Sequence, residues 1–226
     1  MTPPGARERV RRELTAEIKE QALAQLAAGG GAALSLRAIA REMEMASSAL
    51  FRYFPNRDAL LTALIVDSYS SLADAAEAAE ASVHSGTVEE RWMAICRAVR
   101  GWAVARPHEY ALIFGSPIPG YAAPTDTVGP ASRIPVMLGG LLSDLLPDSP
   151  PPAVPPEVEA ALAPLYGTVV PAGVPADLLV RGLMAWTYLF GALSFEVFGH
   201  RHNVVVDHET FFEHEMRRIA VLLGLT

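Results

Sequence analysis

The side chains with the clearest chemical role in this sequence lie in residues 35–57, the run SLRAIAREMEMASSALFRYFPNR. Ser47 and Ser48 can exchange hydrogen bonds with bases and phosphates of a nucleic acid. Arg52 can neutralise a phosphate or read a guanine, and the hydroxyl of Tyr53 can reach a sugar-phosphate backbone. Hydroxyl, phenol and guanidinium groups at this spacing indicate a surface that contacts nucleic acid.

Two short helices would position these side chains. The first begins at Ser35, whose hydroxyl can cap the N-terminal amides. Its inward residues at helical spacing are Leu36, Ile39, Ala40 and Met43, and its outward residues are Arg37, Arg41 and Glu42. After a break at residues 44–46, Ser47 can cap a second helix, from which Leu50 and Phe54 point inward.

Pro55 ends the second helix, because proline cannot continue the helical hydrogen bonds. Arg57 follows in the first turn of the next helix, where a side chain and a helix N-terminus together suit a phosphate. Two helices joined by a three-to-four-residue turn place the second one in the DNA major groove. The stretch therefore predicts a helix-turn-helix module.

The run A-I-A-R-E-M-x-M-x-x-x-x-L-F-R-Y-F-P-N-R-D-A-L-L resembles the DNA-binding signature of the TetR (tetracycline-repressor) family of bacterial regulators. The resemblance implies an all-α fold, with an N-terminal three-helix DNA-binding domain and a larger C-terminal helical domain for effector binding and dimerisation. The DNA contacts that it implies are Arg37, Ser47, Ser48, Ala49, Phe51, Tyr53 and Arg57, to which the residue types add Arg52.

Two positions depart from the family pattern. Glu44 stands where the family usually has a turn glycine, which costs free energy if this residue needs a positive φ. Phe51 replaces the commoner tyrosine and removes one hydroxyl from the expected phosphate contacts. A rival hypothesis follows, in which a helical small-molecule-binding protein or enzyme carries a vestigial DNA-binding module. The sequence does not separate a repressor from an activator or from a regulator with no small ligand, and the resemblance makes repression the expectation.

The length and charge of the chain fit a DNA-binding module at one end. The 226 residues suit a small domain, residues 1–58, followed by a larger one, residues 59–226. The net charge is −7, but residues 1–60 carry nine Lys and Arg against seven Asp and Glu, and the remainder carries nine against eighteen. The N-terminal part is therefore expected to face the polyanion.

The N-terminal helix has an apolar row that would pack under the helix-turn-helix, consisting of Leu14, Ile18, Ala22 and Leu26. It is preceded by a basic stretch that contains Arg7, Arg9, Arg11 and Arg12. These arginines either follow a phosphate strand or minor groove, or form a solvated arm. We favour the solvated arm.

Helical periodicity then continues from Asp58 to about Ser82. This long helix would join the two domains and act as a lever. Thr87 and Glu90 form the sequence pattern of a capping box for the next helix, which should end at Ala105. A short helix is expected to start at Pro107.

Two proline-rich stretches interrupt the helices. Residues 115–135 are rich in Gly and Pro and indicate a loop, after which a helix should resume near Arg133. The connector Pro147–Pro156 has no periodic apolar face and indicates a second surface loop.

The last two helices predict the quaternary structure. Fourteen residues, Gly182–Phe195, contain no charge, but a bilayer span needs about 20, so no membrane contact is expected. A helix that is apolar on nearly all sides needs its own domain on one side and a partner on the other. The final helix offers a matching row, Phe212, Met216, Ile219 and Leu223. Both helices from two chains would form a four-helix homodimer interface, as the TetR resemblance also implies.

The larger domain is expected to bind a small, largely hydrophobic effector. Its bulky aromatic and polarisable residues are Trp92, Trp102, Tyr110, Phe114, Tyr121, Met137, Trp186 and Tyr188. They could surround one mostly apolar pocket, and core packing is the alternative for each of them. The segment W-T-Y-L-F-G-A-L-S-F-E, residues 186–196, also resembles the Trp-His-Gly C-terminal variant of some TetR-like regulators, with Phe190 in place of His.

No catalytic or metal-binding constellation is expected. His200, His202, Asp207 and His208 are close in sequence and are possible zinc ligands, but their spacing matches no metal pattern and suggests an exposed polar loop. The chain has no Ser-His-Asp order, paired catalytic carboxylates or phosphate-binding loop. We therefore expect neither an enzyme nor a cofactor.

The cellular setting is expected to be cytoplasmic. The N-terminus lacks the apolar segment of a secretory signal, and the single cysteine, Cys96, has no partner for an intrachain disulfide. Cys96 lies among Trp92, Ile95 and Val99, which favours a buried apolar role. The sequence as a whole predicts a homodimeric, ligand-responsive repressor. Its recognition helices would occupy successive major grooves of a pseudo-palindromic double-stranded operator.

Overall fold

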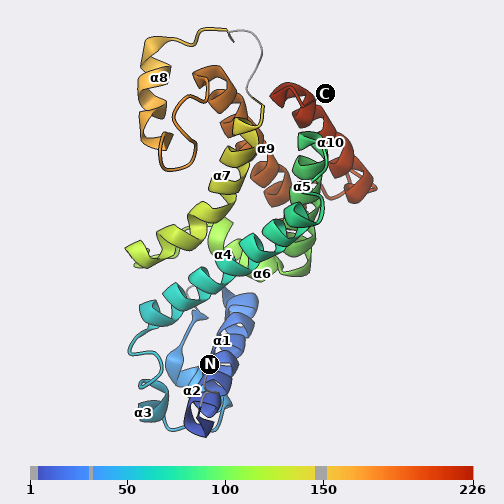
Figure 1. Cartoon of the computed structure of the whole chain (residues 1–226). Coiled ribbons are helices and arrows are strands. Elements are labelled where there is room, and N and C mark those ends of the chain that lie inside the picture. The colour runs from blue at the N-terminus through green and yellow to red at the C-terminus, as the bar shows by residue number, and fades with distance from the viewer. Residues whose placement is uncertain (1–4, 31–32, 146–151, 226) are drawn as a thin grey trace. The chain divides into compact units, whose positions relative to one another are not determined.

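The computed structural model describes residues 5–30, 33–145 and 152–225. Within these residues the chain forms α-helices and short 3-10 turns and contains no β-strand (Figure 1). The α-helices are α1 (Ala6–Gly29), α2 (Leu36–Glu42), α3 (Ser47–Leu50), α4 (Arg57–Ser82), α5 (Val88–Ala105), α6 (Pro107–Phe114), α7 (Val128–Ser143), α8 (Pro156–Leu162), α9 (Ala176–Val197) and α10 (His208–Leu223). The 3-10 turns are η2 (Thr125–Thr127) and η3 (Ala163–Leu165). The predicted all-α class is confirmed.

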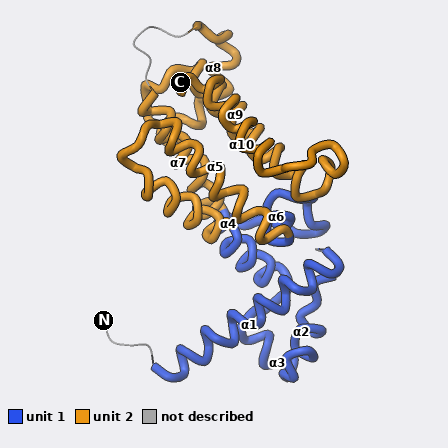
Figure 2. The backbone as a smooth tube through the Cα atoms, turned by 90° about the vertical axis from the view of Figure 1, so that its right-hand side faces the viewer, with its two compact units in different colours: residues 1–68, 108–127 blue, residues 69–107, 128–226 orange. Residues whose placement is uncertain are grey.

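The helices form two compact units (Figure 2). Unit 1 comprises residues 1–68 and 108–127, and unit 2 comprises residues 69–107 and 128–226. The sequence-based division at residue 58 differs from this in two respects. The first part of α4 belongs to unit 1, and so does a segment about forty residues further along the chain, α6 with its following loop.

Unit 1 has its own apolar core. Ile18, Ala22 and Leu26 of α1 are buried as the i+4 spacing predicted, and Leu14 of the same row is half-buried. The other buried members come from α2, α3, α4 and the adjoining segments, and they are Leu34, Leu36, Ile39, Ala40, Leu50, Phe54, Leu60, Leu61 and Leu64. Leu112, Ile118 and Tyr121 pack against this core from the later segment. That packing explains why residues 108–127 belong to unit 1.

A hydrogen bond also ties the later segment to α4. The hydroxyls of Thr62 and Tyr121 are 2.9 Å apart, within unit 1. Lys19 on α1 forms an ion pair of 2.6 Å with Asp67 near the middle of α4. Helix α4 is continuous and begins at Arg57, so a single helix starts beside the predicted helix-turn-helix and continues into unit 2. This confirms the predicted long helix from Asp58 to Ser82.

Unit 2 is built around α5, α9 and α10. The capping box predicted at Thr87 is present, with the backbone N–H of Glu90 donating to Thr87 Oγ1 and the Thr87 backbone N–H donating to Glu90 Oε2. The indole N–H of Trp92 donates to the carbonyl oxygen of Met216, at 3.0 Å. Cys96 is fully buried, as expected, and this burial raises the pKa of its thiol. The thiol is therefore protonated and unreactive.

The loop predicted between residues 115 and 135 is shorter than expected, because α7 begins at Val128 and not near Arg133. Pro130 lies in the first turn of α7, where a backbone N–H has no helical partner, so the proline does not oppose helix formation. Pro135 lies inside the same helix. The predicted connector Pro147–Pro156 lies partly outside the described residues, and α8 begins at Pro156.

Candidate nucleic-acid interface and ligand cavity

Helices α2 and α3 are joined by a turn that closes on Glu44. Ser35 Oγ accepts from the Ala38 backbone N–H, which confirms the predicted cap of α2. At the other end, the N–H of Met45 donates to the Ala40 carbonyl at 2.8 Å, and that of Glu44 donates to the Arg41 carbonyl at 3.2 Å. This pair of bonds is a Schellman motif, which ends a helix with a left-handed residue.

Glu44 supplies that left-handed residue, with a φ of 53°. The position is the one where the family pattern has glycine, so the conformational cost that the sequence suggested is present. A non-glycine residue in this region costs about 1–2 kcal/mol. The hydrogen bonds of the turn and the packing of α2 and α3 compensate for this cost.

Helix α3 is short and starts differently from the prediction. It contains four residues, Ser47–Leu50, and its N-cap is Ala46, not Ser47. The backbone of Ala46 is extended, and its carbonyl accepts the N–H groups of Ala49 and Leu50. Ser47 therefore occupies the first helical position and its hydroxyl remains exposed.

The end of α3 also differs, because the helix stops at Leu50 and turns follow at residues 51–53, ahead of Pro55. Leu50 and Phe54 are both buried, as the periodicity predicted. Their burial fixes the orientation of the intervening residues. Phe51 and Arg52 face solvent, and Tyr53 is half-buried against the core of unit 1.

The structure brings the eight predicted DNA-contacting residues into unit 1, on α2, on α3 with its following turn, and at the start of α4. Arg37, Ser47, Ser48, Phe51 and Arg52 are exposed, and Ala49, Tyr53 and Arg57 are half-buried. Within the described part of the chain, neither Arg37 nor Arg52 has a carboxylate partner, so both guanidinium groups are free to bind an external anion. Arg57 lies 3.6 Å from Asp58, next to Asn56, whose side chain accepts from the Ala59 N–H and caps α4.

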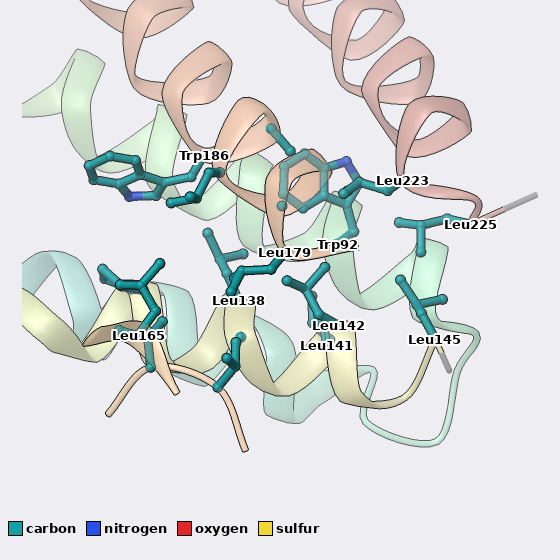
Figure 3. A pocket seen from close by; sticks show the side chains of 17 residues that line it. Trp92, Leu138, Leu141, Leu142, Leu145, Leu165, Leu179, Trp186, Leu223 and Leu225 are labelled. Atoms are coloured by element: carbon teal, nitrogen blue, oxygen red, sulfur yellow. The ribbon is translucent and has the colours of Figure 1, made fainter. Parts of the chain in front are cut away.

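A cavity of about 280 Å³ lies within unit 2 (Figure 3). Figure 3 shows side chains from α7, α9, α10 and the segment after α8 gathered around it, including Leu138, Leu142, Leu165, Trp186 and Leu223. None of the lining residues that the structure describes is charged. The only polar side-chain atoms that they contribute are the two indole N–H groups of Trp92 and Trp186, and that of Trp92 is already donated to Met216.

The structure does not bring the eight predicted effector-binding residues together. Trp92 and Trp186 line the cavity, whereas Trp102, Met137 and Tyr188 belong to unit 2 without lining it. The Trp102 indole donates to Ser71 and the Tyr188 hydroxyl donates to Glu215. Tyr110, Phe114 and Tyr121 belong to unit 1.

The cavity lining consists mostly of leucine, valine and glycine, which the sequence reasoning missed. It includes Leu138, Gly139 and Leu142 on α7, and Val169 and Val170 after η3. Such residues are indistinguishable from ordinary core residues in a sequence. The leucine-rich run of α7 was the available signal, but its periodicity alone predicts burial and not an unfilled space.

The histidine-containing loop holds no cluster suited to a metal ion. Within the described residues, no group of three His, Cys, Asp or Glu side chains is arranged to hold one. Asp207 instead caps α10, accepting from the backbone N–H of Thr210 at 3.0 Å and from its hydroxyl at 2.7 Å. Hydrogen bonds from the side chain and backbone of Thr210 lower the pKa of Asp207.

The apolar row predicted on the final helix faces the interior of its own chain. Phe212, Met216 and Leu223 are buried and Ile219 is half-buried, because this side of α10 packs on α5 and α9. The expectation that this row meets a partner is therefore wrong. The exposed apolar residues of α10 are Phe211, Val221 and Leu222.

Helix α9 does expose an apolar face. Met184, Tyr188, Phe195 and Phe198 are exposed at spacings that place them on one side of the helix, where Thr187 and Gly191 are exposed too. Among the described helices, α9 alone is long and apolar enough to cross a membrane, and 39% of its most apolar window is buried inside the chain.

Two family models match the sequence. The model described as bacterial regulatory proteins, tetR family, matches residues 18–64, and the model described as tetracyclin repressor-like, C-terminal domain, matches residues 92–219. The chain belongs to the TetR family. The predicted helix-turn-helix lies inside the first match, and the cavity lies mostly inside the second.

Similar proteins match nearly the whole chain. The HTH-type transcriptional regulators Rv1816 of Mycobacterium tuberculosis and Mb1846 of Mycobacterium bovis are each 37% identical over 97% of this chain and 96% of their own length. A crystal structure of the regulatory protein SCO4313 is 36% identical and has a TM-score of 0.80, covering 99% of this chain and 100% of that one. A TetR-family protein from Rhodococcus RHA1, 15% identical with a TM-score of 0.64, shares the fold. This TetR-family protein is therefore a DNA-binding transcriptional regulator.

Proposed function

We propose that this TetR-family regulator is a homodimeric repressor that leaves its operator when a neutral, lipophilic effector enters the cavity of unit 2. The observation that carries this proposal is the cavity itself, which has about 280 Å³ of space and an uncharged lining. A folded domain rarely leaves such a space unfilled without a ligand to occupy it.

The DNA-contacting surface consists of the eight residues on α2, α3, the following turn and the start of α4. Two copies in a dimer would occupy successive major grooves of a pseudo-palindromic operator. The exposed hydroxyls of Ser47 and Ser48 stand at the start of α3, where base edges are read. Arg37, Arg52 and Arg57 would contact phosphates, which set affinity and register.

The dimer would form through the exposed face of α9 together with the outward side of α10. Met184, Tyr188 and Phe195 of α9 and its C-cap Phe198 form an exposed apolar stripe, and such stripes mark protein contacts. A second copy related by a two-fold axis presents the same stripe, so the interface is self-complementary. A regulator of this kind acts on chromosomal DNA in the cytoplasm.

The chemistry of the cavity limits the effector. Removing a charged group from water without a partner costs several kcal/mol or more, and the lining residues within the described ranges supply no ion partner. A sugar or nucleotide would likewise leave many hydroxyls or phosphates unpaired. Among the side chains of the described lining residues, the Trp186 indole N–H is the one available donor, so the effector is a neutral lipophilic molecule with at most one or two acceptor groups.

Helix α7 couples the cavity to α4 within unit 2. Its residues Leu138, Gly139 and Leu142 line the cavity, and one to two turns earlier Arg133 reaches α4. The Arg133 guanidinium donates to Glu77 at 2.6 and 2.9 Å and to Asp74 at 2.6 Å. Because α4 continues to Arg57, a displacement of α7 by the effector would be passed to the DNA-contacting end. The effector lowers operator affinity to the extent that it binds the displaced state better.

The test begins with a fluorescence-anisotropy titration of the purified protein against the DNA that flanks its own gene, at two salt concentrations. Saturable binding that resists non-specific competitor is expected, with affinity that falls as salt rises. A panel of neutral lipophiles is then added, and charged analogues of the same molecules serve as controls. The proposal is supported if neutral members of the panel release the protein from DNA and their charged analogues do not. Release by charged analogues alone, or operator binding that no member weakens, contradicts it.

A matched pair of variants tests whether release from DNA depends on effector binding in the cavity. A Cβ at Gly182 would lie 2.4 Å from Leu142 Cδ1, so Gly182→Ala narrows the cavity, whereas a Cβ at Gly140 has no neighbour within 4 Å. We expect Gly182→Ala to raise the effector concentration needed for release at least about tenfold, a loss of about 1.4 kcal/mol, and Gly140→Ala to leave it unchanged. Equal responses would remove the cavity from the mechanism.

A further inference from the structure

We propose that residues 6–14 of α1 form, together with α3 and its flanking turns, a second phosphate-binding surface for operator DNA. This inference rests on the DNA-binding function above and adds residues that the family model does not include. The TetR family match begins at residue 18, whereas α1 begins at Ala6. About three turns of α1 therefore precede the matched region.

A groove of about 670 Å³ lies between this part of α1 and the recognition element, inside unit 1. Its α1 side consists of Ala6, Arg7, Val10, Arg11 and Leu14. Its other side consists of Met45, Ala49, Arg52 and Tyr53, of which the last three are predicted DNA contacts. DNA that is held by α3 therefore lies next to the arginines of α1.

The charge of the groove suits a polyanion. Arg7, Arg11 and Arg52 line it, and no Asp or Glu does. In the part of the chain that the structure describes, none of these three arginines has a carboxylate within ion-pair distance. Most arginines of unit 2 differ in this respect, because ion pairs are formed by Arg91, Arg97, Arg100, Arg133, Arg181, Arg201 and Arg217.

Helix stability accounts for this arrangement only in part, because Glu8 in the first turn favours Arg11 three positions later but does not separate Arg11 from Arg7. Arg7 and Arg11 are separated by four residues and share one face of α1, where like charges repel and weaken the helix. An external anion between them and Arg52 would turn this repulsion into attraction. A DNA backbone supplies such anions at regular spacing.

Arg11 is already held beside the recognition element. Its guanidinium carbon lies 5.9 Å from the centre of the Tyr53 ring, within the range of a cation–π interaction. This contact places the charge of Arg11 against the turn that follows α3. The polar side chains on the α1 side of the groove are the guanidinium groups of Arg7 and Arg11, which bind phosphates well, so the expected partner is the sugar-phosphate backbone of duplex DNA.

The experiment compares Arg11→Ala with Arg9→Ala, which removes the same charge from the same helix at a position that does not line the groove. Affinity for operator DNA and for a scrambled duplex is measured over a range of salt concentrations. Each phosphate contact contributes about 0.9 to the slope of log K against log salt. For a dimer, Arg11→Ala should lower the slope by about 2 and weaken both duplexes at least about tenfold at 0.1 M salt.

Because phosphate contacts carry no sequence information, the ratio of the two affinities should stay the same. Arg9→Ala should leave the salt slope unchanged. Arg11→Lys retains the charge and should therefore keep most of the salt slope of the unsubstituted protein. Equal slopes for Arg11→Ala and Arg9→Ala, with helicity unchanged in both, would overturn the inference. Absence of operator binding by the unsubstituted protein would instead contradict the proposed function, so the two failures are distinguishable.

Discussion

Arg201 and Glu215 form a bidentate ion pair in which the guanidinium donates to both carboxylate oxygens, at 2.7 and 2.8 Å. Only 8% of the Glu215 side chain and 15% of the Arg201 side chain are exposed. The Tyr188 hydroxyl also donates to Glu215, at 2.6 Å, and therefore joins α9 to α10. The loop that carries Arg201 is fixed to α10 by this pair, beside the proposed dimer face.

Removing Arg201 should destabilise unit 2 strongly, because it leaves the Glu215 carboxylate buried without its cation. We expect Arg201→Ala to lower the free energy of unfolding by about 3 kcal/mol. The control is Arg217→Ala, whose side chain is 55% exposed and whose pairing with Glu89 is long, at 3.5 Å. That variant should lose less than about 1 kcal/mol. Urea unfolding measures the free energy of unfolding of both variants. Similar losses would show that burial of the ion pair does not determine how much it stabilises the protein.

The turn at Glu44 should be improved by glycine, because glycine adopts a positive φ without steric cost. We expect Glu44→Gly to be more stable than Glu44→Ala by about 0.5–1 kcal/mol. The alanine variant removes the same charge but keeps the strained backbone, so it isolates the conformational effect. Thermal unfolding of the two variants measures the difference. A more stable alanine variant would mean that the turn tolerates a side chain at no cost.

Neighbouring glycines on α7 should respond in opposite ways to alanine. A Cβ at Gly139 would lie 2.2 Å from the Val169 carbonyl oxygen, which is backbone and cannot rotate away. We expect Gly139→Ala to lower the free energy of unfolding by about 1–3 kcal/mol. At Gly140 the space is open, so alanine should stabilise the helix by up to about 1 kcal/mol. Equal effects on urea unfolding would indicate that the segment after η3 does not pack on α7.

Acid should weaken the contact between α5 and α10. Hydrogen bonds from Arg97 lower the pKa of Glu213 from its ordinary value of 4.5. The folded state therefore favours the ionised carboxylate, so the stabilisation is complete above pH 4.5 and disappears as the pH falls through the lower, folded-state pKa. The stability of Glu213→Gln should depend less on pH in this range. Urea unfolding at neutral pH and at about pH 3.5 tests this expectation, and parallel pH profiles would contradict it.

The α9 stripe should be required for dimer formation. Phe195→Asp places a charge in the middle of the exposed apolar face and should convert the dimer to a monomer, because the charge would be buried without a partner. Val206→Asp is the control, since Val206 is fully exposed and lies outside both helices. Sedimentation equilibrium at several protein concentrations distinguishes the two. A dimeric Phe195→Asp variant would place the interface elsewhere.

The sequence predicted most of the local structure because the signals are local. Ser35 and Thr87 are helix caps, and Leu50 and Phe54 are buried on either side of exposed residues, as their spacing indicated. The sequence pattern failed where two neighbouring residues could both be the N-cap of the same helix. Ser47 appeared to be a cap, but the extended backbone of Ala46 starts α3 one residue earlier. The N-cap depends on backbone conformation as well as residue type.

By itself the sequence determined the family, the all-α class and the position of the helix-turn-helix, because a signature of this length specifies a local structure. Tertiary packing decided the rest. Periodicity shows that Phe212 and Met216 share a face of α10 but not which neighbour covers them, and the structure places that neighbour in the same chain. The cavity also results from tertiary packing, because an unfilled space depends on how α7, α9 and α10 pack together. Likewise Arg11 lies beside Tyr53 only after α1 packs on the helix-turn-helix.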